Sequence, residues 1–215
     1  MKTGLLVFLL CFGGRFFAQQ TPVPAGKNFL INGNFEVGSP GYSALPDQWE
    51  NCGPRSESPP DLHGKNTRLF GVNTRAAEGK QFVGLVVRQN GTQECLLQNF
   101  PETLPLGTYR LRFAAAIPTD LKSPSRETGR SINYNRPVEL RVLMRTDGST
   151  VDDWAEVTEI DHSKWRYYEL DLTVDRTVYG LVLMPAHSEP TPYSGAVLLD
   201  DVSLTKRADP AEEPR

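Results

Sequence analysis

Cysteine, histidine, methionine and tryptophan are all scarce in this chain of 215 residues, which has three of each. One cysteine lies near the N-terminus. The other two and the scattered histidines match no compact spacing of zinc ligands, which argues against a zinc site. After residue 18 no apolar run is long enough to cross a bilayer. No segment shows the periodicity of a convincing amphipathic helix, so the sequence predicts an all-β protein without membrane insertion.

The common signatures of catalysis are also missing. The chain has no Gly-x-Ser-x-Gly elbow, no His-Glu-x-x-His motif and no glycine-rich phosphate loop. His63, His162 and His187 all fall in predicted loops, far apart in the sequence. We therefore predict that the protein is not an enzyme.

The N-terminus has the features of a targeting segment. Lys2 is followed by an apolar run from Leu5 to Phe12, and Phe16-Phe17-Ala18 precedes Gln19. This pattern predicts a signal peptide over residues 1–18, and the polar, proline-containing stretch 19–27 is predicted to be a linker. A lipoprotein anchored at Cys11 is the alternative, but Leu10 is large for that kind of cleavage site. The expected location is secreted, extracellular or periplasmic, with attachment to a cell surface left open.

The charge balance is acidic. Without Lys2 and Arg15 the chain has 21 basic against 26 acidic residues, which argues against nucleic acid or an anionic membrane as partner. Cys52 and Cys95 then remain alone in an oxidising compartment. A disulfide between them is predicted, with two buried free thiols as the alternative.

Short alternating or apolar runs, separated by proline and glycine, follow one another from residue 28 to residue 205. With 17 prolines and 18 glycines, this composition suits many turns. The runs predict an antiparallel two-sheet β-sandwich (jelly roll) over 28–205, followed by a disordered tail over 206–215. Residues 52–65 and 118–135 are predicted to be long loops. The predicted strands are 28–37, 68–73, 81–88, 94–100, 108–117, 138–146, 156–160, 165–174, 178–184 and 196–204.

The last of these strands contains two adjacent carboxylates. Strict alternation places Asp200 on one face with Leu198, Val202 and Leu204. A carboxylate on an apolar face needs a cation or several hydrogen-bond donors. Because the first predicted strand also contains an acid, Glu36, we expect the two ends of the domain to meet in space.

Three motifs carry a family resemblance: Asn32-Gly33-Asn34-Phe35-Glu36, Leu45-Pro46-Asp47-Gln48-Trp49 and Leu199-Asp200-Asp201-Val202-Ser203-Leu204. Together they resemble the galactose-binding-like jelly-roll family, which includes carbohydrate-binding modules of bacterial glycosidases and related surface proteins. The resemblance implies a structural calcium ion (Ca2+) between the first and last strands, held by Glu36 and Asp200 with Asp201 as a third ligand. The alternative is that hydrogen bonds or an arginine hold Asp200 without a metal.

The resemblance also implies non-catalytic recognition of a polysaccharide or other glycan, at a bacterial cell surface or in the extracellular matrix. Sugar sites combine aromatic rings with polar groups. The predicted ligand-binding residues are Trp154, Tyr134, Arg112, Arg141 and Tyr193. Each has a plain structural alternative, such as solvating a sheet face or packing under a loop. The alternative function is a structural or adhesive surface protein that binds protein partners and no sugar. The sequence does not indicate the oligomeric state.

Overall fold

The computed structural model describes residues 26–124, 128–147 and 150–208, without the side chains of 147 and 150–155. The predicted signal peptide over 1–18, most of the linker over 19–27 and most of the tail over 206–215 lie outside the described residues. Among the described residues, no helix is long and apolar enough to cross a membrane.

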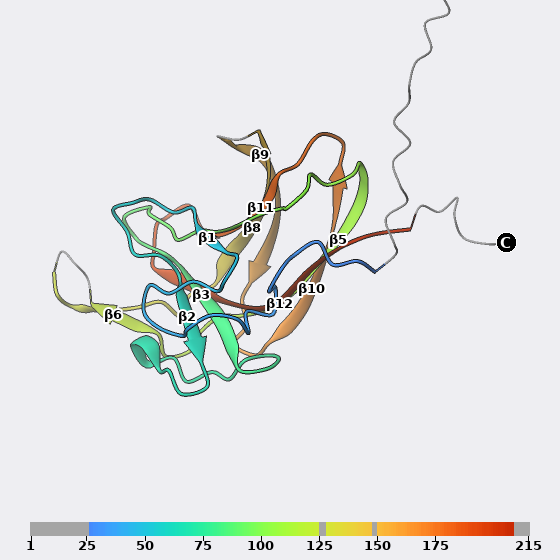
Figure 1. Ribbon diagram of the computed structural model, residues 1–215. Helices are drawn as coiled ribbons and strands as arrows, with labels where there is room; N and C mark the ends of the chain where they lie inside the picture. The colour runs from blue at the N-terminus through green and yellow to red at the C-terminus, as the bar shows by residue number, and fades with distance from the viewer. Residues whose placement is uncertain (1–25, 125–127, 148–149, 209–215) are drawn as a thin grey trace, which may run out of the picture.

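Two five-stranded antiparallel sheets face each other and form a sandwich (Figure 1). The first sheet has the order β1 (Glu50–Asn51), β4 (Leu96–Asn99), β11 (Gly180–Ala186), β8 (Val138–Asp147) and β9 (Thr150–Ile160). The second sheet has the order β10 (Arg166–Val174), β5 (Gly107–Ala116), β12 (Gly195–Lys206), β3 (Gln81–Val87) and β2 (Asp61–Gly64). The predicted fold class, an antiparallel β-sandwich of the jelly-roll kind, is confirmed.

The main core lies between the sheets and follows from the alternation of the sequence. Tyr109, Leu111 and Phe113 on β5 are fully buried, and they face the equally buried Val138 and Leu140 of β8. Residues at the intervening positions, such as the arginines of β5, point to the outer face of their sheet. Trp49 is 4% exposed in this core, as expected for a packing residue and not for a sugar platform.

A smaller core covers part of the outer face of the second sheet. Phe82 of β3 and Leu198 of β12 are buried there in one apolar cluster with residues that lie next to two short elements in the sequence. These elements are the 3-10 helix η1 (Leu69–Gly71) and the hairpin of β6 (Lys122–Pro124) and β7 (Ser131–Asn133). Figure 1 shows this hairpin standing out beside β2 and β3. The predicted loop 118–135 therefore contains a hairpin, and the predicted strand 68–73 contains a 3-10 helix.

The ends of the domain do meet, but the first segment is not a strand. Phe29 N donates to Leu204 O over 2.8 Å, and Val202 N donates to Gly33 O over 2.8 Å. At Gly33 a Cβ atom would lie 1.9 Å from Val202 O, so only glycine allows this approach. Asn32 and Phe35 have positive φ angles of 52° and 56°, which break the extended conformation predicted for 28–37.

A β-bulge overturns the predicted alternation in the closing strand. The register of β12 against β5 shifts between Asp200 and Ser203, and Asp201 has a φ of 47°. As a result Asp200 and Leu198 lie on the outer side of the sheet, whereas Val202 and Leu204 lie in the main core. The extra residue of a bulge moves every later side chain to the other face.

Two further boundaries differ from the prediction. Strand β2 lies within the loop predicted for 52–65, and His63 is therefore on a strand. Strand β9 starts at Thr150, so Trp154 lies on a strand instead of a loop.

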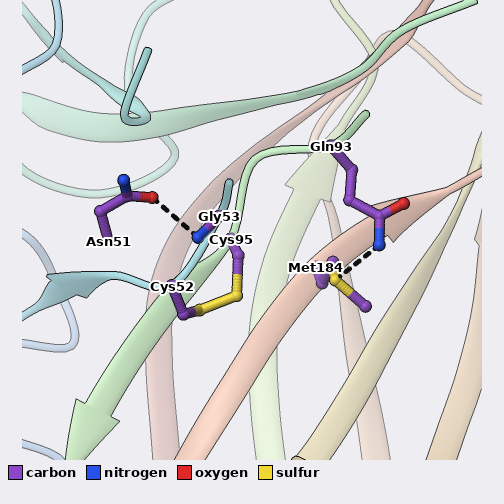
Figure 2. The surroundings of a disulfide bond; sticks show 6 residues. All are labelled: Asn51, Cys52, Gly53, Gln93, Cys95 and Met184. Carbon is purple, nitrogen blue, oxygen red and sulfur yellow. Dashed lines mark hydrogen bonds between the residues drawn. A yellow bond between two sulfur atoms is a disulfide. The ribbon is translucent and has the colours of Figure 1, made fainter. Parts of the chain in front are cut away.

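The predicted disulfide is present. Cys52 and Cys95 are bonded, with Cα atoms 4.9 Å apart, and they belong to a small apolar cluster on the outer face of the first sheet (Figure 2). The bond links the segment after β1 to the start of β4, and Cys52 N also donates to Cys95 O over 3.2 Å. It therefore holds the edge strand β1 of the first sheet against β4.

Candidate functional site

A cavity of about 1080 Å³ opens beside the outer face of the second sheet. Its walls come from η1, the start of β2, the turn between β3 and β4, and the β6–β7 hairpin. These segments are distant in sequence, and the second small core holds them against β3. The volume lies just above the range of about 300–1,000 Å³ that is typical of small-molecule pockets.

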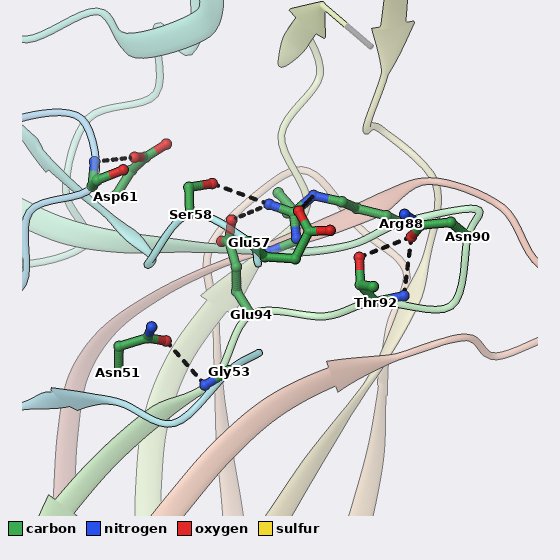
Figure 3. A network of polar contacts seen from close by, with 11 residues as sticks. Asn51, Gly53, Glu57, Ser58, Asp61, Arg88, Asn90, Thr92 and Glu94 are labelled. Carbon is green, nitrogen blue, oxygen red and sulfur yellow. Dashed lines mark hydrogen bonds and ion pairs between the residues drawn. The ribbon is translucent and has the colours of Figure 1, made fainter. Parts of the chain in front are cut away.

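Arg88 is the centre of a charged cluster on the floor of this cavity (Figure 3). Its Nη2 lies 2.6 Å from Glu94 Oε1, its Nε lies 3.5 Å from Glu57 Oε2, and Nη2 also donates to Ser58 Oγ over 3.3 Å. The β3–β4 turn places Glu94 opposite Val86, whose N–H donates to Glu94 Oε2 over 3.1 Å. Arg88 Nη1 is buried and has no hydrogen-bond partner among the described residues.

Two carboxyl groups that line the cavity have pKa values above the ordinary carboxyl range. Burial raises the pKa of Glu94 to about 8, although Arg88 acts in the opposite direction. Burial also raises the pKa of Asp61 to about 6, against a hydrogen bond of 2.8 Å from Ser43 N. Asp61 has no ion pair among the described residues, whereas Glu94 has Arg88.

Aromatic side chains form one rim of the cavity. Tyr42 and Phe70 pack edge to face with ring centroids 5.5 Å apart, and Tyr42 is 56% exposed. Phe70 has φ 52° and ψ 26°, a left-handed conformation that costs a bulky residue about 1–3 kcal/mol. Tyr134 forms part of the inner wall, where burial raises the pKa of its hydroxyl. An exposed ring beside buried polar groups is the pattern that sugar binding needs.

Of the five predicted ligand-binding residues, Tyr134 lines this cavity. Tyr193 is buried and structural: its hydroxyl donates to Pro137 O over 2.6 Å and accepts from Ser188 N over 2.9 Å. Trp154 lies on β9, and its side chain is outside the described part of the chain.

The two predicted arginines lie on different sheets and cannot share one site. Arg112 on β5 bonds Asp201 over 2.8 Å and covers the ring of Tyr167 at 3.7 Å from its centroid. Arg141 on β8 lies 3.6 Å from Glu139 on the outer face of the first sheet. Both interact with neighbours on their own sheet face, as the structural alternative proposed.

The predicted calcium ligands are only partly brought together. Glu36 Oε1 accepts from Lys80 N over 2.7 Å and from Gln81 N over 2.8 Å, and Asp200 Oδ2 accepts from Glu78 N over 3.0 Å. Both acids thus bind the same loop through its N–H groups.

Asp201 points instead to Arg112. Among the described residues, no three His, Cys, Asp or Glu side chains converge on a point that suits a metal ion. As positioned, these residues do not fit a calcium shell. The ion stays a prediction, which a fall in melting temperature on chelation would support.

The histidines do not form a shared site. His63 is 1% exposed and stacks on Phe82, and burial lowers its pKa to about 4. His162 bonds the Tyr168 hydroxyl over 2.6 Å, and His187 bonds Tyr193 O over 2.8 Å. None of the three lines the cavity.

Sequence reasoning missed Arg88, Glu94, Asp61, Tyr42 and Phe70. One signal was present: Arg88 and Glu94 flank the Asn90-Gly91 turn, so a hairpin brings them together across the two chain segments. Tyr42 and Phe70 gave no such signal, because they meet only through the long connections around β2.

No protein-family model matches the sequence, and no curated protein matches it. Several solved structures share the fold. The enzymatically active domain of tailspike protein 4 from bacteriophage CBA120 has a TM-score of 0.51 at 12% identity, with 84% of this chain and 21% of that chain covered. This chain therefore spans about a fifth of that protein.

A cyclase from Fischerella sp. TAU has a TM-score of 0.51 at 16% identity, with 84% of this chain and 97% of that chain covered. A family 16 carbohydrate-binding module has a TM-score of 0.48 at 16% identity, with 82% of this chain and 99% of that chain covered. At these identities the likeness concerns the fold alone, and one fold serves many functions.

Proposed function

We propose that the protein is a non-catalytic carbohydrate-binding module that takes part of a glycan into the cavity between η1 and the β6–β7 hairpin. The observation that carries this proposal is the exposed Tyr42 ring at the rim of a cavity whose floor is polar. Sugars have apolar C–H faces that stack on rings, and hydroxyls that need donors and acceptors.

Different residues of the cavity contact the apolar face and the hydroxyl groups of the sugar. Tyr42, supported by Phe70, offers the stacking surface at the rim. The Arg88 side chain is 16% exposed and lines the floor with N–H groups, and Ser58 and Ser194 add hydroxyl groups. Because Glu57 and Glu94 hold the guanidinium in place, a sugar hydroxyl meets a donor that is already oriented.

The test is a broad glycan-array screen of residues 19–215, followed by titration calorimetry with the best ligand. Tyr42→Ala is expected to weaken binding at least tenfold, equivalent to about 1.4 kcal/mol. Tyr179→Ala is the matched control, because Tyr179 is 44% exposed but lies beside the far end of β4, outside the cavity. Equal losses in the two variants would place the site elsewhere.

Acid–base catalysis in the same cavity is a second candidate. Its support is that Asp61 and Glu94 both have raised pKa values there, a pattern of catalytic carboxyl pairs. We favour binding alone because both oxygens of Glu94 already accept hydrogen bonds, from Val86 N and Arg88. Release of reducing ends from a bound glycan, abolished by Glu94→Gln, would establish the hydrolase.

We further propose a secreted, extracellular or periplasmic location, since disulfides such as that between Cys52 and Cys95 form and persist mainly in oxidising compartments. Redox-controlled alkylation of the protein in its native host tests this. The cysteines should resist alkylation until a reductant is added.

A further inference from the structure

Asp61 is a cavity carboxyl group that lacks a paired cation in the described part of the chain. It lies on β2 opposite Gly84, so its side chain points to the outer face of the sheet, where the cavity is. It accepts one hydrogen bond, from Ser43 N over 2.8 Å, and it has no ion pair among the described residues. A largely buried carboxylate with one donor is incompletely compensated.

The cations near Asp61 compensate it only in part: the charge of Arg88 favours the ionised Asp61, but the two side chains form no ion pair. Arg88 is held by Glu94 at 2.6 Å and by Glu57 at 3.5 Å, so its guanidinium is paired with two carboxyl groups other than Asp61. Arg130 lines the cavity from the β6–β7 connection, but it is exposed to solvent. Asp61 therefore keeps a charge that no side chain of the described residues pairs with, which favours a positive group of the ligand beside it.

The aromatic rim adds to this preference. Cations bind the faces of tyrosine and phenylalanine rings, and Tyr42 and Phe70 line the same cavity as Asp61. A ligand ammonium placed there meets a carboxylate as well as the two rings, whereas a neutral sugar has no charge to set against that carboxylate.

Building on the proposed function, we infer that the glycan carries free amino groups, as in a polymer of deacetylated amino sugars, with one ammonium set against the Asp61 carboxylate. The ammonium donates to Asp61, the carboxylate keeps its bond from Ser43 N, and Arg88 keeps its pairs with Glu94 and Glu57. The Asp61 carboxylate thereby gains the paired cation that it otherwise lacks among the described residues.

The experiment is titration calorimetry at pH 6.5 with three oligomers of equal length: β-1,4-linked glucosamine, its N-acetylated counterpart and β-1,4-linked glucose. The glucosamine oligomer is expected to bind at least tenfold more tightly than the other two. Asp61→Asn should remove this preference, because the amide keeps the acceptor for Ser43 N but loses the charge. Asp175→Asn is the matched control: it removes a fully exposed carboxylate in the turn after β10 and should change nothing.

Two results would overturn the inference. If the three oligomers bind equally, or if the preference survives in a folded Asp61→Asn variant, the amino group is not recognised, while the proposed glycan binding stands. If the folded protein binds no oligomer here and no sugar on a broad array, the proposed function fails and the inference fails with it.

Discussion

Glu94 is the residue on which the floor of the cavity most depends. Its side chain is 6% exposed and pairs with Arg88 at 2.6 Å. Glu94→Ala removes the nearest acceptor of the buried Arg88 guanidinium and leaves Glu57 at 3.5 Å, so it is expected to lower the free energy of unfolding by about 3 kcal/mol. Urea denaturation measures this loss.

The control for this substitution is an exposed ion pair on the same sheet. Glu169 lies 3.2 Å from Arg110 and its side chain is 51% exposed, so Glu169→Ala should cost less than about 1 kcal/mol. If the free energy of unfolding falls equally in both variants, the Arg88–Glu94 pair stabilises the protein no more than an exposed ion pair does.

At the scale of elements, the contact between the N-terminal segment and β12 depends on Gly33. A Cβ atom at this position would lie 1.9 Å from Val202 O, and a backbone oxygen within a strand cannot easily move. Gly33→Ala is therefore expected to destabilise the fold by about 3 kcal/mol, at the upper end of the range for overpacking.

Thermal unfolding compared with Gly41→Ala checks this prediction. A Cβ atom at Gly41 would lie 3.6 Å from the Ala44 side chain, an ordinary contact, and Gly41 has no positive φ angle. A melting temperature of Gly33→Ala that equals that of Gly41→Ala would show that the two ends are not held together in this way.

The disulfide is the second interaction that holds two elements together. It joins cysteines that are 43 residues apart, and the entropy of closing such a loop in the unfolded chain corresponds to about 4 kcal/mol. Cys52→Ala with Cys95→Ala should lower the free energy of unfolding by about this amount in urea. An unreduced, denatured wild-type protein should contain no titratable thiol in the mature chain, and two thiols would contradict the bond.

At the scale of the whole molecule, the structural features that follow from a repeated sequence pattern were predicted correctly. The alternating and apolar runs predicted strands at 108–117 and 138–146, which are close to β5 and β8, and therefore the sandwich. The same rule placed Asp200 with Val202 and Leu204, because one bulge at Asp201 cannot be seen in the alternation. The cavity was missed for a related reason: Tyr42, Asp61 and Arg88 are brought together by connections whose paths follow no periodicity.

The pH dependence of stability is also a property of the whole molecule. Burial raises the pKa of Asp61 and of Asp200 to about 6, and that of Glu94 to about 8. The folded protein therefore binds more protons than the unfolded chain between the ordinary carboxyl pKa and these values. Where the folded state binds more protons, stability falls as the pH rises.

Buried His63 acts in the opposite direction. Its folded pKa of about 4 lies below the ordinary histidine pKa of 6.5, so its contribution to stability is lost as the pH falls between these two values. Because three carboxyls oppose one imidazole, we expect the free energy of unfolding to rise as the pH falls from 8 to 5. Urea denaturation at several pH values measures this rise, and Asp200→Asn should make it smaller by removing one of the three groups. A stability that increases steadily from pH 5 to pH 8 would mean that these carboxylates are stabilised in the folded protein, for instance by a bound cation.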